Sequence, residues 1–251
     1  MATWLLATAA FLLTQAAVAA SLQVSPISLE FSPEEQAQGI WLSNTGTVPL
    51  RAQVRVQQWS QTDGSDQLAP ARDMTASPPM LEIAAGARQL VRIIRLQSTA
   101  PAQELSYRLL VDELPDESRQ QEDSGLQFLL RYSVPVFVLP QGSEATNAGG
   151  KSIPLTDTST LSAVLHQDRK EPSLAVSNQG RQRVRISQLV HVAADGTRTP
   201  LVPGLLGYVL AGQNMQWPLE LPASLGGNGV LKAKFNNDVE EQSLPLVTAV
   251  R

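Results

Sequence analysis

Short runs of alternating apolar and polar residues dominate the chain, and helical periodicity is nearly absent. In LRAQVRVQQW (50–59), small apolar residues occupy every second position, and arginine or glutamine occupies the positions between them. Because successive side chains of a strand point to opposite faces, this period predicts half-buried strands. Similar runs recur between turn signals such as TDGSD (62–66), so the sequence predicts an all-β protein.

The predicted strands fall into two groups. Residues 21–140 hold about seven of them, the density of an immunoglobulin-like sandwich, and the first is interrupted at Pro26. Residues 141–152 are rich in glycine and polar residues, which indicates a linker. The pattern then restarts, since LAVSNQG (174–180) repeats the end of GIWLSNTG (39–46). We therefore expect a second, smaller sandwich over residues 153–251; a single large barrel is the alternative that the linker disfavours.

The first 20 residues carry no charged side chain. Their apolar run from Trp4 to Leu13 is too short to span a bilayer, and the small residues 17–20 follow it. This pattern predicts a signal peptide over residues 1–20, cut after Ala19 or Ala20, with a buried N-terminal helix as the alternative. No later segment stays apolar for 18 residues, so we expect no stable membrane insertion of the mature chain.

Composition narrows the function classes. Hydrophobic residues make up 43% of the chain and charged residues 17%, which suits a folded core. The net charge is −4 with both signs interspersed, so we expect no nucleic-acid partner. There is no cysteine, and the two histidines, His166 and His191, have no ligand partners at metal-site spacing. No nucleophile motif is present, and the acidic run DELPDE (112–117) is expected at a solvated strand end, so we expect neither a cofactor, a metal nor an enzyme.

One apolar segment stands out, because GLQFLLRYSVPVFVLP (125–140) directly follows the polar run DESRQQEDS (116–124). An exposed strand of this kind is a template for pairing with another chain. Leu129 and the residues from Val134 to Val138 are expected to fill the chain's own core. The function of the segment then depends on where the remaining apolar side chains point.

Several segments together resemble one family. They are LSNTG (42–46), ASPPMLEIAAGARQLVRIIR (76–95), SYRLLVDELP (106–115), LQFLLRYSVPVFVLP (126–140), LAVSNQG (174–180) and KFNND (234–238). Their order and spacing are similar to those of the PapD-like periplasmic pilus (fimbrial) assembly chaperones, and closest to the archaic branch that serves spore-coat-U-like pili. The resemblance implies two immunoglobulin-like sandwiches in a boomerang arrangement. It also implies a periplasmic chaperone that completes pilin subunits by donor-strand complementation and delivers them to an outer-membrane usher.

The resemblance also assigns site residues. The side chains that would fill the groove of a pilin subunit fall on Leu126, Phe128 and Leu130, which are two apart and share one side of a strand. An interdomain charge cluster falls on Arg92, Glu113 and Asp238. An arginine can bond two carboxylates at once, which would fix the angle between the domains.

The chain departs from the family at the anchor for the subunit's C-terminal carboxylate. Better-known members use two basic residues, and the matching positions hold Ser28 and Pro135. Either the anchor is lost or another cation supplies it, and the candidates are Arg88, Arg95 and Arg131. The Pro-Pro turn in ASPPM (76–80) is expected to contain a cis bond at one of its prolines.

Two other functions compete with the chaperone. An exported pilin or adhesin would be a structural β-sandwich protein, but pilins usually carry cysteines and lack a final strand. An exported hydrolase or glycan-binding module would favour clustered aromatic residues, and these make up only 5% of the chain.

Overall fold

A computed structural model describes residues 21–115, 129–143, 156–167, 171–222 and 229–247. The predicted signal peptide and most of the predicted linker lie outside these ranges. Within them the chain folds as β-sheets, with a single 3₁₀ turn at Thr158–Thr160 and no α-helix, so the all-β prediction is confirmed. No helix in the described parts is long and apolar enough to cross a membrane.

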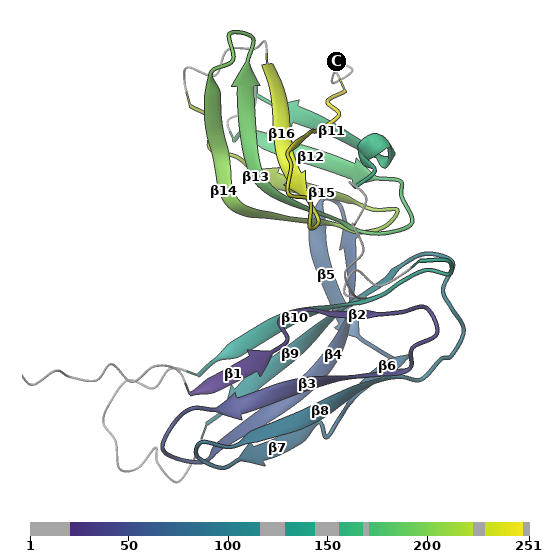
Figure 1. Cartoon of the computed structure of the whole chain (residues 1–251), viewed down its shortest axis with the longest axis vertical. Helices are drawn as coiled ribbons and strands as arrows, with labels where there is room; N and C mark the ends of the chain where they lie inside the picture. Colours follow the sequence, from purple (N-terminus) through teal and green to yellow (C-terminus); the bar gives the residue numbers. More distant parts are fainter. Residues whose placement is uncertain (1–20, 116–128, 144–155, 168–170, 223–228, 248–251) are drawn as a thin grey trace, which may run out of the picture.

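The first domain is a sandwich of two sheets (Figure 1). One sheet has the order β1 (Leu22–Ser25), β3 (Ala37–Asn44), β8 (Arg88–Arg95) and β6 (Met74–Ser77). The other has the order β2 (Leu29–Phe31), β10 (Arg131–Val138), β9 (Leu105–Leu114), β4 (Leu50–Thr62) and β5 (Ser65–Pro70), with β7 (Met80–Ile83) also paired to β4. The inward positions of both sheets meet in one core around Phe31, Ile40 and Leu109, which are almost fully buried.

The second domain is a smaller sandwich. A three-stranded sheet contains β11 (Leu161–His166), β12 (Ser173–Asn178) and β15 (Asn214–Pro218). The facing sheet has the order β14 (Arg198–Val209), β13 (Val184–Ala193), β16 (Gly229–Phe235) and β17 (Gln242–Ser243). A separate core around Leu174, Ile186 and Phe235 lies between these two sheets. The second sandwich is therefore a domain of its own, and the two domains do not form a single barrel.

The first strand changes sheets at Pro26. Before it, β1 pairs antiparallel with β3; after it, β2 pairs parallel with β10. The Ser25–Pro26 bond is cis, and the proline has no N–H to contribute to a ladder, so the interruption read from the sequence is confirmed. The Ser77–Pro78 bond is the cis bond of the Pro-Pro turn.

The sequence repeat of the two domains is also a structural repeat. The amide nitrogen of Asn44 donates to the carbonyls of Val48 and Ile83, and its side-chain oxygen accepts from Gly46 N–H. Asn178 makes the same three bonds in the second domain. Both asparagines are 1% exposed, so each satisfies buried main-chain groups that water cannot reach.

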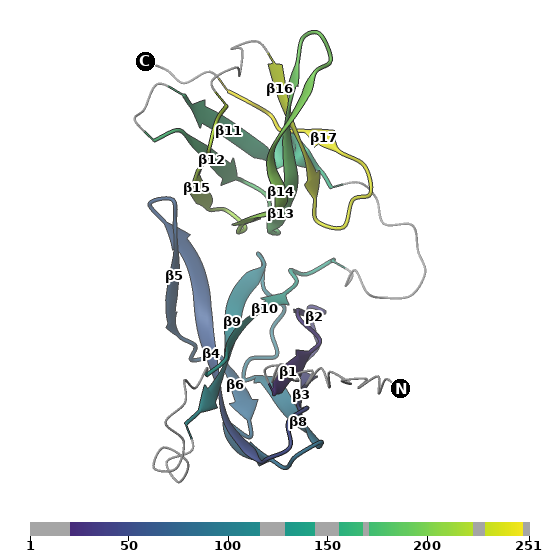
Figure 2. The same ribbon diagram turned by 90° about the vertical axis from the view of Figure 1, so that its left-hand side faces the viewer.

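The β4–β5 hairpin joins the two domains, because it extends beyond its own sandwich to the second one (Figures 1 and 2). Its turn is Asp63–Gly64, and both residues have positive φ, as a two-residue hairpin turn requires. The main-chain N–H of Gln216 on β15 donates to the carbonyl of Gly64 at 3.1 Å. A Cβ at Gly64 would lie 2.9 Å from that of Gln216, so this contact needs a glycine.

Candidate functional site

Strand β10 has one edge that is open over half its length. It pairs antiparallel with β9 along all of Arg131–Val138. On its other side β2 pairs only with Val136–Val138. Within the described part of the chain, the stretch from Arg131 to Pro135 therefore has no neighbouring strand on that side.

The main-chain groups of this open edge can be assigned by alternation. The carbonyl of Leu130 accepts from Glu113 N–H on β9 at 2.9 Å, whereas Leu139 N–H donates to Phe31 at the β2 side at 3.0 Å. Because the bonds of successive residues alternate in direction along an antiparallel pair, even-numbered residues bond β9 and odd-numbered residues face the other edge. The N–H groups of Arg131 and Ser133 thus point to the open edge. Pro135, which has no N–H, lies where a proline is tolerated.

Side chains alternate along the same segment. Leu130, Tyr132 and Val134 face the first core, and Leu130 is only partly buried there. Leu129 is 50% exposed, so the expectation that it fills the chain's own core is wrong. The residues from Val134 to Val138 are all buried, as expected. Leu126 and Phe128, two of the three predicted groove-filling residues, lie outside the described residues.

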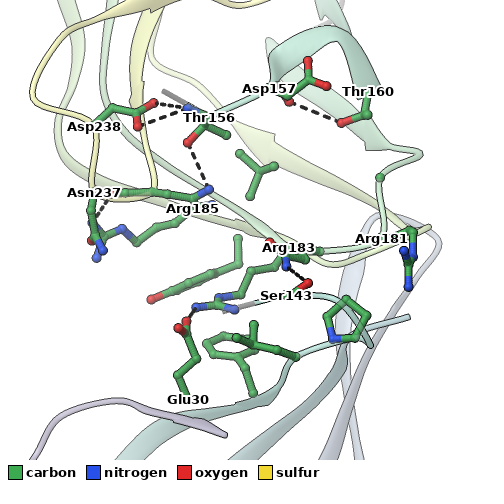
Figure 3. A pocket seen from close by; sticks show the side chains of 18 of the residues that line it. Glu30, Ser143, Thr156, Asp157, Thr160, Arg181, Arg183, Arg185, Asn237 and Asp238 are labelled. Carbon is green, nitrogen blue, oxygen red and sulfur yellow. Dashed lines mark hydrogen bonds and ion pairs between the residues drawn. The ribbon is translucent and has the colours of Figure 1, made fainter. Parts of the chain in front are cut away.

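A cleft of about 810 Å³ lies between the domains beside β2 and the end of β10. Arg183, the residue immediately before β13, reaches across the cleft to the first domain (Figure 3). Its guanidinium bonds Glu104 at 2.5 Å and Glu30 at 2.6 Å, and its Cζ atom lies 3.5 Å from the ring centre of Phe137. This arginine therefore holds two carboxylates of the first domain and stacks on its last long strand, which ties the domains together.

Glu104 is the most buried member of this ion cluster, with a side chain that is 0% exposed. Burial raises the pKa of its carboxyl above the ordinary value, although the charge of Arg183 and the hydrogen bonds from it oppose the shift. The carboxylate of Glu104 therefore depends on Arg183 to remain charged inside the interface.

The structure does not bring together the three residues predicted as the interdomain cluster. Arg92 is exposed on β8, and Glu113 lies at the end of β9 opposite to Glu104. Asp238 stays within the second domain, where it accepts from Thr156 N–H at 3.2 Å. All three residues belong to the part of the chain that the structure describes, and no ion pair links any two of them there. An arginine between two carboxylates does occupy the interface, but it is built from other residues.

The predicted carboxylate anchors lie outside the cleft. Arg95 is 6% exposed and donates to the carbonyls of Pro33, Glu35 and Thr99, so its guanidinium is already used inside the first domain. Arg131 is exposed and pairs with Asp112. Arg88 lies on the other sheet, with its Cζ atom 4.5 Å from the ring centre of Trp41.

A different arginine, Arg108, lies next to Pro135, one of the two positions where the resemblance led us to expect a basic residue. Arg108 on β9 is the register partner of Pro135, and both line a pocket of about 310 Å³ at the domain junction. Its guanidinium lies 3.7 Å from the ring centre of Trp59, and burial lowers its pKa. In the part of the chain that the structure describes, no hydrogen bond or ion pair reaches this guanidinium. Arg108 is not among the candidates predicted from the sequence, although the alternation of YRLLV (107–111) places it on the outer face of the sheet.

The same outer face forms the apolar contact between the domains. Trp59 is 3% exposed and packs against Phe137 of its own sheet. It also packs against Tyr208 on β14 and against Leu210, which follows the end of β14. Next to it, the side-chain amide of Gln61 donates to the carbonyl of Tyr208 at 2.8 Å and accepts from Leu210 N–H at 2.9 Å. The hairpin therefore fixes the second domain by packing and by paired main-chain groups.

No group of three His, Cys, Asp or Glu side chains in the described residues is arranged to hold a metal ion.

One family model and several solved structures of assembly chaperones match the chain. Residues 21–144 match the family model of the pili and flagellar-assembly chaperone, PapD N-terminal domain. No curated protein sequence matches the chain. Solved structures do: one is the CsuC–CsuE chaperone–tip adhesion subunit complex from the archaic chaperone-usher Csu pili of Acinetobacter baumannii, at 23% identity and TM-score 0.67, covering 92% of this chain and 100% of that one.

Two further structures have the same fold. The Escherichia coli chaperone DraB matches at 16% identity and TM-score 0.59, over 90% of this chain and 97% of its own. A chain of the Salmonella enterica SafA pilin–SafB chaperone complex matches at 17% identity and TM-score 0.55, over 86% of this chain and 89% of its own. The family is one of assembly chaperones and not of enzymes. The first domain of this chain therefore belongs to the PapD family of pilus and flagellar assembly chaperones.

Proposed function

We propose that the protein is a periplasmic chaperone of the archaic type, which binds spore-coat-U-like pilin subunits through the open edge of β10 and passes them to an outer-membrane usher. The observation that carries the proposal is the edge from Arg131 to Pro135, which has main-chain groups but no partner strand in the described structure. The segment LQFLL (126–130), in which every residue except Gln127 is apolar, precedes it directly in the sequence. We propose that the two segments act together as one strand that completes the sheet of a subunit.

The energy available to such a contact is sufficient. Burying Leu126 and Phe128 in a subunit groove contributes about 1.5–3 kcal/mol for each side chain, or about 3–6 kcal/mol together, and Leu130 adds less because it already packs partly against the chain's own core. Each main-chain hydrogen bond at the open edge adds about 0.5–1.5 kcal/mol. Part of this gain is offset by the ordering of both chains on binding.

We also propose that Arg108 anchors the subunit's terminal carboxylate. Because β2 occupies the edge from Val136 onward, a subunit strand on this edge must end beside Pro135 and Ser28. A strand parallel to β10 would bring its C-terminus to that point. Arg108 lies across from Pro135 with a half-buried guanidinium that lacks an acceptor among the described residues, and a carboxylate would supply one.

Phe128→Asp tests the donor strand. The variant is co-expressed with a neighbouring pilin-like subunit, and recovery of a soluble one-to-one complex is measured by pull-down. We expect a folded chaperone that captures no subunit, because the charge would enter an apolar groove. Leu129→Asp is the matched control, since Leu129 faces the opposite side and should leave capture intact. Normal capture by folded Phe128→Asp would refute the donor assignment.

Arg108→Gln tests the anchor against the three sequence candidates. Subunit affinity should fall about tenfold or more, the loss of a charge-assisted contact of about 1.5–3 kcal/mol, and Arg108→Lys should restore part of it. Charge reversal at Arg88 and Arg131 should leave the affinity within about twofold of the wild type. A loss confined to either of these two would move the anchor to that residue, and Arg95 would be tested only with a fold control because it is buried.

A further inference from the structure

The outer face of the other sheet of the first domain carries an apolar pair between two arginines. Trp41 on β3 and Leu90 on β8 are register partners, and each is 37% exposed. Arg88 and Arg92 lie two residues to either side of Leu90, so all three side chains share the outer face. We name these four residues the arginine-flanked face. Strands β3 and β8 lie at the front of the lower domain in Figure 1, and the second domain does not cover them.

The charge of this sheet is one-sided. Its four strands contain three arginines and no aspartate or glutamate, although the whole chain has 23 acidic and 19 basic residues. Arg95, the third arginine, is buried. On the opposite sheet, by contrast, Arg55 and Arg131 share the carboxylate of Asp112.

The two exposed arginines have few partners of their own. Arg88 stacks on Trp41, and neither Arg88 nor Arg92 forms a hydrogen bond or ion pair with any residue that the structure describes. Their guanidinium groups therefore keep their donors for an external acceptor.

Gly39 shapes the centre of the face. A Cβ at this position would lie 2.7 Å from Cδ1 of Leu90, so the absence of a side chain lets Leu90 lie flat beside Trp41. Trp41 and Leu90 therefore form an apolar patch between the guanidinium groups of Arg88 and Arg92. Arg88 and Arg92 are four residues apart along an extended strand, which separates their Cα atoms by about 13 Å.

We propose that the arginine-flanked face binds an extended acidic segment of a partner protein, in which two carboxylates four residues apart flank a bulky apolar side chain. The carboxylates would meet Arg88 and Arg92, and the apolar side chain would cover Leu90 and Trp41. A second copy of this chain fits less well, because two such faces would oppose arginine with arginine. The site lies on the sheet that does not contain β10, so it is separate from the proposed subunit edge.

A synthetic peptide tests the proposal. The blocked peptide Ser-Glu-Thr-Phe-Thr-Glu-Ser is titrated into the purified protein at low salt, and the Trp41 indole N–H signal is followed by NMR. We expect a saturable shift of this signal and an affinity about fivefold or more above that of the peptide with glutamine in place of both glutamates. Raising the salt to about 0.5 M should weaken binding, because the charges are exposed.

Variants separate the face from general charge attraction. The double variant Arg88→Ser, Arg92→Ser should lose about fivefold or more in affinity for the glutamate peptide. Arg72→Ser, which removes an exposed arginine outside the face, should match the wild type. Equal binding of the two peptides, unchanged binding by the double variant, or no Trp41 shift would each overturn the proposal. The Phe128→Asp variant should bind the peptide normally, which distinguishes this result from a failure of the proposed subunit site.

Discussion

Replacing Arg183 with methionine should lower the free energy of unfolding by an amount that depends on pH. In the native structure Arg183 is 16% exposed and bonds the fully buried carboxylate of Glu104. Without the arginine, Glu104 either remains as an uncompensated buried charge, which costs about 3–5 kcal/mol, or takes up a proton. The second route sets the limit on the part of the loss that comes from Glu104.

The cost of that proton can be worked out. The ordinary pKa of the glutamate is 4.5, and keeping it protonated costs about 1.36 kcal/mol for each pH unit above this value. The limit is therefore about 3.4 kcal/mol at pH 7.0 and about 1.4 kcal/mol at pH 5.5. A carboxyl with a raised folded pKa favours folding below its unfolded pKa and loses this contribution as the pH rises through its folded pKa. The variant should thus be weakest at neutral pH and recover in acid.

Urea unfolding at the two pH values measures this effect, with the fluorescence of interface residue Trp59 and circular dichroism as probes. We expect Arg183→Met to lose about 3 kcal/mol at pH 7.0 and less than half of that at pH 5.5. Arg181→Met is the control. The side chain of Arg181 also reaches toward the first domain, but it bonds only the carbonyls of Ala102 and Gln141 and no carboxylate. An equal loss at both pH values, or a loss below about 1 kcal/mol at pH 7.0, would refute the reasoning.

Three further changes test the rest of the fold. Asn44→Ala and Asn178→Ala should each cost about 2–4 kcal/mol in urea unfolding, because two buried carbonyls lose their donor; a loss below about 1 kcal/mol in either would contradict the shared role. Gln61→Leu should cost about 2–4 kcal/mol, reported by Trp59 fluorescence, with exposed Thr62→Ala as the silent control. Asp112→Asn should cost about 1 kcal/mol at pH 7: burial raises the pKa of this carboxyl, but the hydrogen bonds from its two arginines outweigh burial and hold it below the ordinary value. Its contribution is present above an unfolded pKa of about 4 and is lost as the pH falls through the folded pKa, so a difference that does not shrink as the pH falls below about 4 would contradict this origin.

The local pattern of the sequence was enough to predict most of the strands. Alternating residues identified strands such as β4, and the break at Pro26 marked the change of sheets. The repeated Ser-Asn-x-Gly segment pointed to the same turn in both domains, because the asparagine, the glycine and their spacing are all local. The exposed position of Leu129 was also present in the pattern, since Arg131 and Ser133 mark the odd positions as outward.

Charge pairing could not be predicted in the same way. Arg183 meets Glu30 and Glu104, which lie 153 and 79 residues earlier in the chain, and nothing local specifies such partners. The family positions gave three residues of suitable charge that the fold keeps apart. Arg108 became a candidate only when the register placed it across from Pro135.

Amide hydrogen exchange in a complex with a pilin-like subunit tests the central claim most directly. The N–H groups of Arg131 and Ser133 face the open edge, whereas those of Tyr132 and Val134 already face β9. We predict that binding slows exchange at Arg131 and Ser133 by about tenfold or more and changes Tyr132 and Val134 much less. Unchanged exchange at Arg131 and Ser133 in a complex that has formed would show that the subunit does not bind along this edge.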